Sequence, residues 1–159
     1  MVDEAKLERP FNHPVEVGIR LLYILNVFHP RSFDIKHLLY MDYLLVHSAD
    51  AGGPSSLHAA MPYRTGEWLV RRKILEAGLA LMFSKELLSK HLSNDGITFS
   101  ASPLTKHFLK HLKSEYALGL YTRAEWLKLK FDNMNSNQIN EFMKLNLTSW
   151  GNEFKAIQY

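Results

Sequence analysis

The sequence predicts a mainly α-helical protein with one small β-hairpin, in which a winged helix-turn-helix core is followed by C-terminal helices. Apolar residues recur at helical spacing through most of the chain, which indicates amphipathic helices. An Asp-Gly pair at 95–96 separates a partly alternating run from a clearly alternating one, and this is a strong hairpin signal. Helix, helix, loop, helix and hairpin is the order of elements in a winged-helix domain.

The first helix is expected to open at residues 13–14, because proline suits the first helical position, and to end before Pro30. The second is expected to begin near Ser32 or Asp34, since either side chain can cap the free amides, and its apolar face extends to Val46.

Residues 48–64 contain glycine and proline without a sustained period, which predicts an ordered loop. Thr65 is predicted to cap a third helix that ends near Phe83. The hairpin then occupies the two runs on either side of residues 95–96.

Ser102-Pro103 is predicted to begin one long helix that extends to about Phe131, with Gly119 as its weak point. A last helix is expected over about 136–147. We therefore expect a winged-helix domain at 1–101 and a helical extension at 102–159 that packs on this domain or on a partner.

The composition favours a cytoplasmic protein with a hydrophobic core. The chain has 159 residues, 47% of them hydrophobic, and no cysteine. Charged residues interrupt every apolar run before it reaches the roughly 20 residues of a membrane span. The first nine residues lack the apolar stretch of a secretory signal. No membrane association and no cofactor is expected.

The middle of the chain is its basic part, because residues 64–130 contain twelve Lys or Arg and six Asp or Glu. In a winged helix the third helix can enter a DNA groove, and the hairpin can reach phosphates. Phosphate contact is favoured over base reading, because no Asn or Gln accompanies the arginines. The competing interpretation is that these cations form only the solvated side of a helix. The candidate nucleic-acid-binding residues are Arg64, Arg71, Arg72, Lys73, Lys90 and His91.

Residues His47, Asp50 and His58 are the one loop cluster that resembles a metal set. Their spacing matches no metal motif, so no metal is expected. Ser55 lacks the G-x-S-x-G context of an exposed nucleophile, and no phosphate-binding loop is present. A metal-dependent hydrolase is therefore a minor hypothesis, and no catalytic residue is expected.

Asp42 lies within an apolar helical stripe, where an unpaired carboxylate is strongly unfavourable. We expect a structural ion pair with Arg20 or Arg64.

Four stretches carry a family resemblance: YMDYLLVHSAD at 40–50, GPSSLH at 53–58, PYRTGE at 62–67 and LVRR at 69–72. With them, the chain resembles the middle-component family, of the middle component 2 type, of ABC-ATPase three-component bacterial defence systems. The similarity extends from about Phe11 to Tyr116 and Arg123. Residues 59–61 depart from it, and the tail beyond Phe131 shows no resemblance.

The resemblance implies a non-catalytic adaptor that links an SMC-like or related ABC ATPase to an effector in defence against phages and plasmids. Contact with double-stranded DNA and a homodimer through the C-terminal helices are further expectations. The Gly-Pro-Ser loop is expected either to staple the second helix to the third or to present a fixed shape to a partner. The residues of this loop network are His47, Asp50, Ser55, His58 and Glu67. The alternative function is a free-standing winged-helix transcription regulator that binds DNA by itself.

Overall fold

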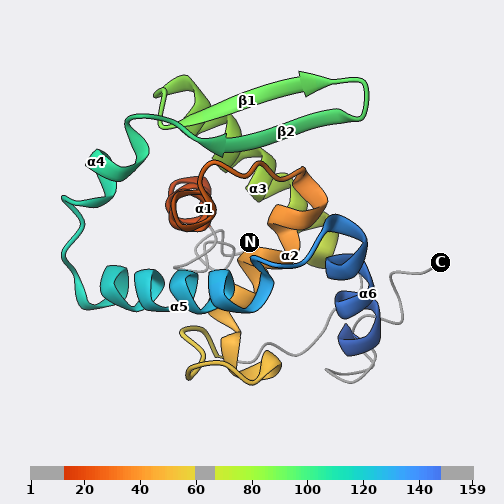
Figure 1. Ribbon diagram of the computed structural model, residues 1–159. Helices are drawn as coiled ribbons and strands as arrows, with labels where there is room; N and C mark the ends of the chain where they lie inside the picture. The colour runs from red at the N-terminus through yellow and green to blue at the C-terminus, as the bar shows by residue number, and fades with distance from the viewer. Residues whose placement is uncertain (1–12, 60–66, 148–159) are drawn as a thin grey trace, which may run out of the picture.

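The computed structural model describes residues 13–59 and 67–147 (Figure 1). The mainly helical class with one antiparallel hairpin is confirmed. No helix in the described ranges is both long and apolar enough to cross a bilayer. The elements in chain order are α1 (Pro14–Phe28), α2 (Ile35–Val46), the 3₁₀ helix η2 (Ser48–Ala51), α3 (Glu67–Ser84), β1 (Leu88–Ser93), β2 (Gly96–Ala101), α4 (Thr105–Leu109), α5 (Glu115–Phe131) and α6 (Ser136–Leu147).

Helix α1 is the central element of the fold. Figure 1 shows it end-on, with the other elements arranged around it. It contacts α2, α3, α4, α5 and β2. Leu21, Leu22, Ile24 and Leu25 are completely buried, as expected for a helix that is apolar on almost every side.

The predicted starts of the first two helices are confirmed. The His13 side chain accepts a hydrogen bond from the Val15 amide at the start of α1. Asp34, and not Ser32, caps α2, because its carboxylate accepts from the His37 amide. Each cap gives a partner to an amide that the helix leaves unpaired.

Helices α1 and α3 approach each other closely at two glycines. A Cβ atom on Gly78 would lie 2.9 Å from the Pro14 carbonyl oxygen and 3.0 Å from the Gly18 nitrogen. A Cβ atom on Gly18 would in turn meet the Met82 side chain. The lack of a side chain at both positions therefore sets the distance between these two helices.

The predicted hairpin is confirmed, but its turn lies one residue earlier than the Asp-Gly pair suggested. Ser93 pairs with Gly96, so Asn94 and Asp95 form the connection. Neither of these two residues has a positive φ, whereas Gly96 has a φ of +120°. Glycine is thus needed at the first residue of β2, where the chain re-enters the ladder.

An isolated β-bridge joins the hairpin to the segment between α1 and α2. Phe33, between α1 and α2, forms an antiparallel bridge with Phe99 of β2. Each amide donates to the other's carbonyl oxygen, at 2.9 and 2.8 Å. Both phenylalanines are buried, so the base of the hairpin is fixed on the core.

The prediction of a single long helix from residue 103 to residue 131 is wrong. The chain forms a short α4, turns, and starts α5 at Ser114, whose side chain accepts from the Ala117 amide. This break reverses the chain, and α5 then packs against α1 and α2. Gly119, the expected weak point, lies inside α5. The last helix is confirmed as α6.

The C-terminal helices share the hydrophobic core of the rest of the molecule. Leu120, Leu127, Phe131, Ile139 and Met143 are buried in the same cluster as the residues of α1 and α2. The division into domains at residues 101 and 102 stays a prediction.

Candidate functional site: a buried charge network, a loop and a basic face

Asp42 of α2 is the centre of a buried charge network. Its carboxylate accepts hydrogen bonds from Arg20 Nε at 2.6 Å and from Arg20 Nη2 at 2.9 Å. Arg71 of α3 donates to the same carboxylate at 3.0 Å. The expected ion pair with Arg20 is confirmed, and the other expected partner, Arg64, lies outside the described residues. One carboxylate thus links three helices.

The charges of this cluster decide the protonation of its members. Burial alone raises the pKa of Asp42, but the charges of Arg20 and Arg71 are so close that its pKa falls below the ordinary range. Burial works against the charge of Arg20, and Asp42 more than compensates, so the pKa of Arg20 is raised. At neutral pH, Asp42 is therefore a carboxylate between two guanidinium groups.

Arg71 is separated from the two cations that follow it in the sequence. Its side chain is 23% exposed and points toward Asp42, whereas Arg72 and Lys73 are exposed. The sequence analysis grouped all three on a nucleic-acid-binding face. Arg71 instead shares the inner stripe of α3 with Leu75 at i+4, and this spacing was a signal for its inward position. Its guanidinium is thus already engaged inside the protein.

Aromatic rings and histidines extend the network from Asp42 to the loop. The Arg71 guanidinium lies 5.7 Å from the centre of the Tyr43 ring, and the Tyr43 hydroxyl donates to Asp50 at 2.6 Å. His47 packs on Tyr43, and its ring meets the His58 ring edge-on. Three of the predicted loop-network residues, His47, Asp50 and His58, are therefore brought together.

Both histidines are held in the neutral form. Burial lowers the pKa of His58 to about 4, with further contributions from the charge of Arg20 and from His47. Burial, followed by the charge of Arg71, also lowers the pKa of His47. The His58 Nε2 atom lies 2.7 Å from the Tyr116 hydroxyl of α5. The pair acts as a neutral polar contact between the loop and α5.

A second set of contacts attaches the loop to α5. Arg123 donates through Nε to the Ser55 carbonyl oxygen at 2.8 Å and through Nη2 to Ser55 Oγ at 3.1 Å. Gly53 lies directly against the Trp126 ring, with no room for a Cβ atom. The sequence analysis missed Tyr116, Arg123 and Trp126 as partners of the loop. These contacts attach the loop to α5. The side chain of Glu67, the remaining residue of the predicted loop network, is outside the described part of the structure.

The remaining predicted cations lie on α3 and on β1. Arg72 pairs with Glu76 at 3.0 Å on the outer surface of α3. Lys90 Nζ lies 5.8 Å from the centre of the Phe83 ring, and His91 Nε2 lies 2.7 Å from Ser100 Oγ. Lys73, Lys90 and His91 are exposed, so they can reach a partner.

The polar groups of the loop are bonded to other parts of the same chain. Among residues 13–59 and 67–147, no group of three or more His, Asp or Glu side chains is arranged to hold a metal ion. Ser55 Oγ accepts a hydrogen bond from Arg123 Nη2, and His58 Nε2 lies within hydrogen-bonding distance of the Tyr116 hydroxyl.

Comparison with known proteins places the chain in a family. No curated protein and no solved structure matches it significantly. The model of the family described as ABC-three component (ABC-3C) system Middle Component 2 matches residues 10–153, which is almost the whole chain. This match includes the Asp42 network, the loop and all described helices. The protein therefore belongs to the middle component 2 family of ABC-three-component systems.

Proposed function

We propose that this protein is a non-catalytic adaptor that links an SMC-like or related ABC ATPase to an effector in a bacterial system that defends against phages and plasmids. The observation that carries the proposal is the family match over residues 10–153, because a middle component of a three-component system has protein partners.

The arrangement of the polar residues supports a role without chemistry. Three polar side chains form hydrogen bonds with other parts of the same chain: Asp42 with Arg20, His58 with Tyr116, and Ser55 with Arg123. An active site needs such groups directed at a substrate. The network instead holds the loop in one shape, as a binding surface requires.

The outer face of α3 is the part of the proposed adaptor that we assign to a partner. Leu69 and Val70 are 69% and 57% exposed, beside the exposed Arg72 and Lys73. Exposed aliphatic groups next to cations are typical of protein interfaces and are not needed for phosphate contact. The ATPase is the partner that we propose for this face.

DNA contact is a finer proposal for the same face. The helix order, together with the strand-like bridge between Phe33 and Phe99, supports a winged-helix arrangement. Arg72 and Lys73 would then meet phosphates from α3, with Lys90 and His91 from the hairpin. A free-standing DNA-binding regulator is the alternative function.

The adaptor proposal is tested by reconstituting the system from its three purified components. We expect the ATPase and the effector to copurify only when this protein is present. Leu69→Ser with Val70→Ser should remove the ATPase and leave the effector bound, because both side chains are outside the core. The matched control is Leu145→Ser, which changes an exposed leucine on α6. Equal copurification of ATPase and effector without this chain would overturn the proposal.

DNA contact is tested with Arg72→Glu combined with Lys73→Glu in a band-shift assay on duplex DNA at low salt. Arg71 is left unchanged, since its replacement would also disturb Asp42. The control combines Lys85→Glu with Lys144→Glu, two exposed lysines outside this face. Salt-sensitive binding that only the first variant weakens supports the contact. Tight binding of a specific site by the protein alone would favour the regulator.

A further inference from the structure

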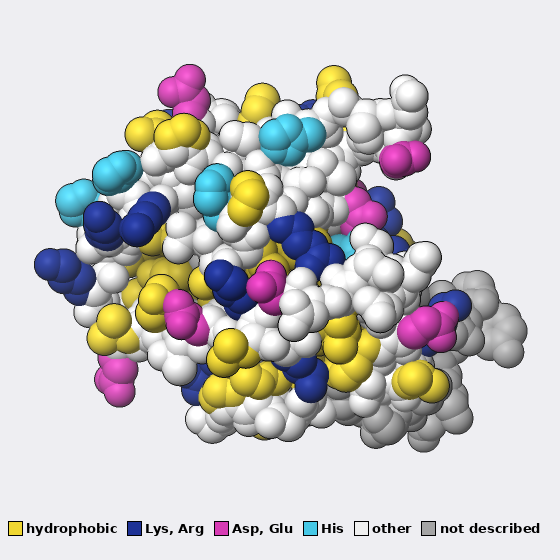
Figure 2. All heavy atoms as spheres, in the orientation of Figure 1, with side chains coloured by type: hydrophobic (Ala, Val, Ile, Leu, Met, Phe, Trp, Pro, Cys, Tyr) yellow, Lys and Arg dark blue, Asp and Glu magenta, His cyan; other side chains and the backbone are white. Residues whose placement is uncertain are grey.

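A groove between α1, α4 and α5 is lined by lysines and apolar groups at once. Its volume is about 980 Å³, at the upper end for binding pockets. Figure 2 shows basic and hydrophobic side chains gathered around a hollow on this side of the molecule. None of the individual residues that the sequence analysis named for DNA contact or for the loop network lies in it.

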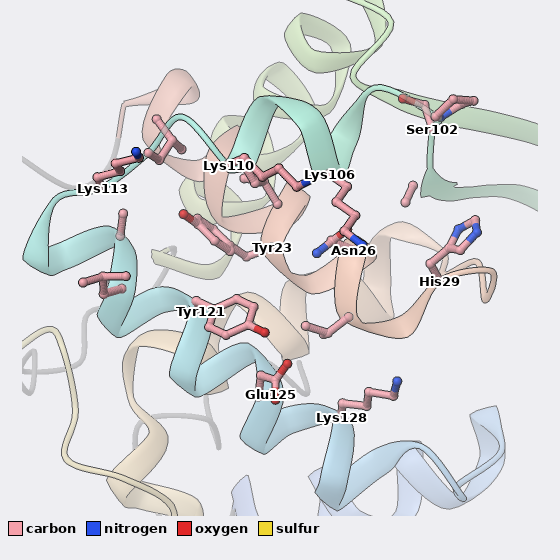
Figure 3. A pocket seen from close by; sticks show the side chains of 17 residues that line it. Tyr23, Asn26, His29, Ser102, Lys106, Lys110, Lys113, Tyr121, Glu125 and Lys128 are labelled. Atoms are coloured by element: carbon pink, nitrogen blue, oxygen red, sulfur yellow. The ribbon is translucent and has the colours of Figure 1, made fainter.

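The walls of the groove are basic. Figure 3 shows Lys106 and Lys110 extending from the α4 side and Lys128 from α5 on the opposite side. Lys113 lies at one end of the groove (Figure 3). Glu125 is the one carboxylate among the lining residues, and its interaction with the Tyr121 hydroxyl raises the pKa of Tyr121. The groove therefore has a strong excess of positive charge.

The floor and rim of the groove are apolar and aromatic. Tyr23 and Val27 of α1 and Leu109 of α4 are buried at its base. Leu118 and Tyr121 of α5 line its rim, although their side chains are 60% and 47% exposed. Exposed groups of this size beside a concavity are typical of a binding surface.

From this combination we infer that the groove binds an acidic segment of a partner protein, in which Asp or Glu residues flank an apolar side chain. The lysines on opposite walls would meet the carboxylates, and the apolar side chain would enter between Tyr121 and the floor. The inference concerns a surface separate from the outer face of α3, so it does not depend on DNA contact.

Two other occupants fit the groove less well. Duplex DNA is read by protruding elements, commonly with arginines, and this groove is concave and contains no arginine in its lining. A second copy of the chain that docked through the same surface would bring two sets of four lysines together, and like charges in an interface are strongly unfavourable.

The inference is tested on the purified chain alone by fluorescence anisotropy. The probe is a short labelled peptide in which Leu and Phe are flanked by Glu, and the comparison peptides replace Glu by Gln or the apolar residues by Ser. We expect salt-sensitive binding of the first peptide only. Lys106→Glu with Lys110→Glu should weaken it about tenfold or more. Both side chains are exposed, so the fold is expected to survive, and circular dichroism checks this.

The matched control again changes two exposed lysines outside the groove, Lys85→Glu with Lys144→Glu, and should leave peptide affinity unchanged. Leu118→Ser should weaken the binding of the acidic peptide without altering the charge of the groove. Four outcomes would overturn the inference: no binding of the acidic peptide at low salt, equal loss in the control variant, tighter competitive binding of oligothymidine through the same lysines, or a dimer that the Lys106 and Lys110 changes dissociate. A failed peptide assay leaves copurification of the ATPase and the effector as a separate test of the adaptor.

Discussion

Arg20 and Asp42 form a two-point ion pair inside the protein, in which neither side chain is more than 1% exposed. The two residues belong to neighbouring helices, and the same carboxylate also receives a hydrogen bond from Arg71 of α3. A charge this deep is tolerated only when it is paired and hydrogen-bonded. The pair therefore fixes how α1, α2 and α3 meet, and it positions the loop and the outer face of α3 that the proposed function uses.

Replacement of Asp42 by Asn should destabilise the protein by about 3–5 kcal/mol, because it leaves the buried Arg20 charge without its counter-ion. Urea unfolding measures this change. Asp50→Asn, which alters an exposed carboxylate bonded to Tyr43, should cost about 1 kcal/mol or less. Equal stability of the wild type and the Asp42 variant would show that the pair is not structural.

Acidification below pH 6.5 should reduce stability because of His58. The pKa of His58 is lowered from 6.5 to about 4 in the folded state. Between pH 6.5 and pH 4, His58 is therefore protonated in the unfolded chain but remains neutral in the folded chain. The contribution of neutral His58 to the free energy of unfolding is therefore fully present above about pH 6.5 and is lost as the pH falls toward 4. The loss in the free energy of unfolding that is due to His58 alone should be about 2 kcal/mol, a value already reduced for its partial exposure.

The pH effect is measured as the unfolding free energy at several pH values. His58→Gln should flatten the slope between pH 6.5 and 4, and a smaller slope from His47 should remain, because the pKa of His47 is also lowered. His107→Gln, on the exposed surface of α4, is the matched control variant. A rise in stability on acidification would contradict the assignment. Protonation of Asp42 belongs to a lower pH range, since the nearby charges of Arg20 and Arg71 lower its pKa.

Gly78→Ala should destabilise the protein by about 2 kcal/mol, although alanine is the better helix former. The added methyl group would meet backbone atoms of α1 at Pro14 and Gly18. These atoms can move away only if the helix backbone shifts. In Gly119→Ala the nearest atom is the end of the Leu57 side chain, which can turn, so we expect a change below about 1 kcal/mol. Thermal unfolding of both variants tests the contrast, and equal effects would refute it.

Glu86→Gly should stabilise the protein by about 1 kcal/mol. Glu86 follows α3 with a φ of +58°, a left-handed conformation that is unfavourable for residues with a Cβ atom. Its hydrogen bond with Ser102 uses the backbone oxygen, which glycine retains. Lys85→Gly, where φ is not positive, should not stabilise. A lower melting temperature for the Glu86 variant would count against this view.

The starts of the first two helices and the presence of the hairpin could be predicted from sequence for a local reason. Caps, turn residues and apolar spacing act over a few positions. The long middle helix was wrong because residues 103 to 131 keep a helical period across the break, and a serine that caps α5 resembles any other polar residue on a helix surface.

The sequence by itself determined the starts of the first two helices, the presence of the hairpin, the family and the need of Asp42 for a counter-ion. Only the tertiary structure decided that Arg71 turns inward to that carboxylate, that the loop is attached to Tyr116 and Arg123 of α5, and that lysines of α4 and α5 face one groove. The reason is that the hydrogen bonds Arg71–Asp42, His58–Tyr116 and Arg123–Ser55 join residues 29, 58 and 68 positions apart, and the groove brings together two helices on either side of a turn in the chain. Which distant side chains meet depends on how the helices pack, and no short pattern in the chain encodes that.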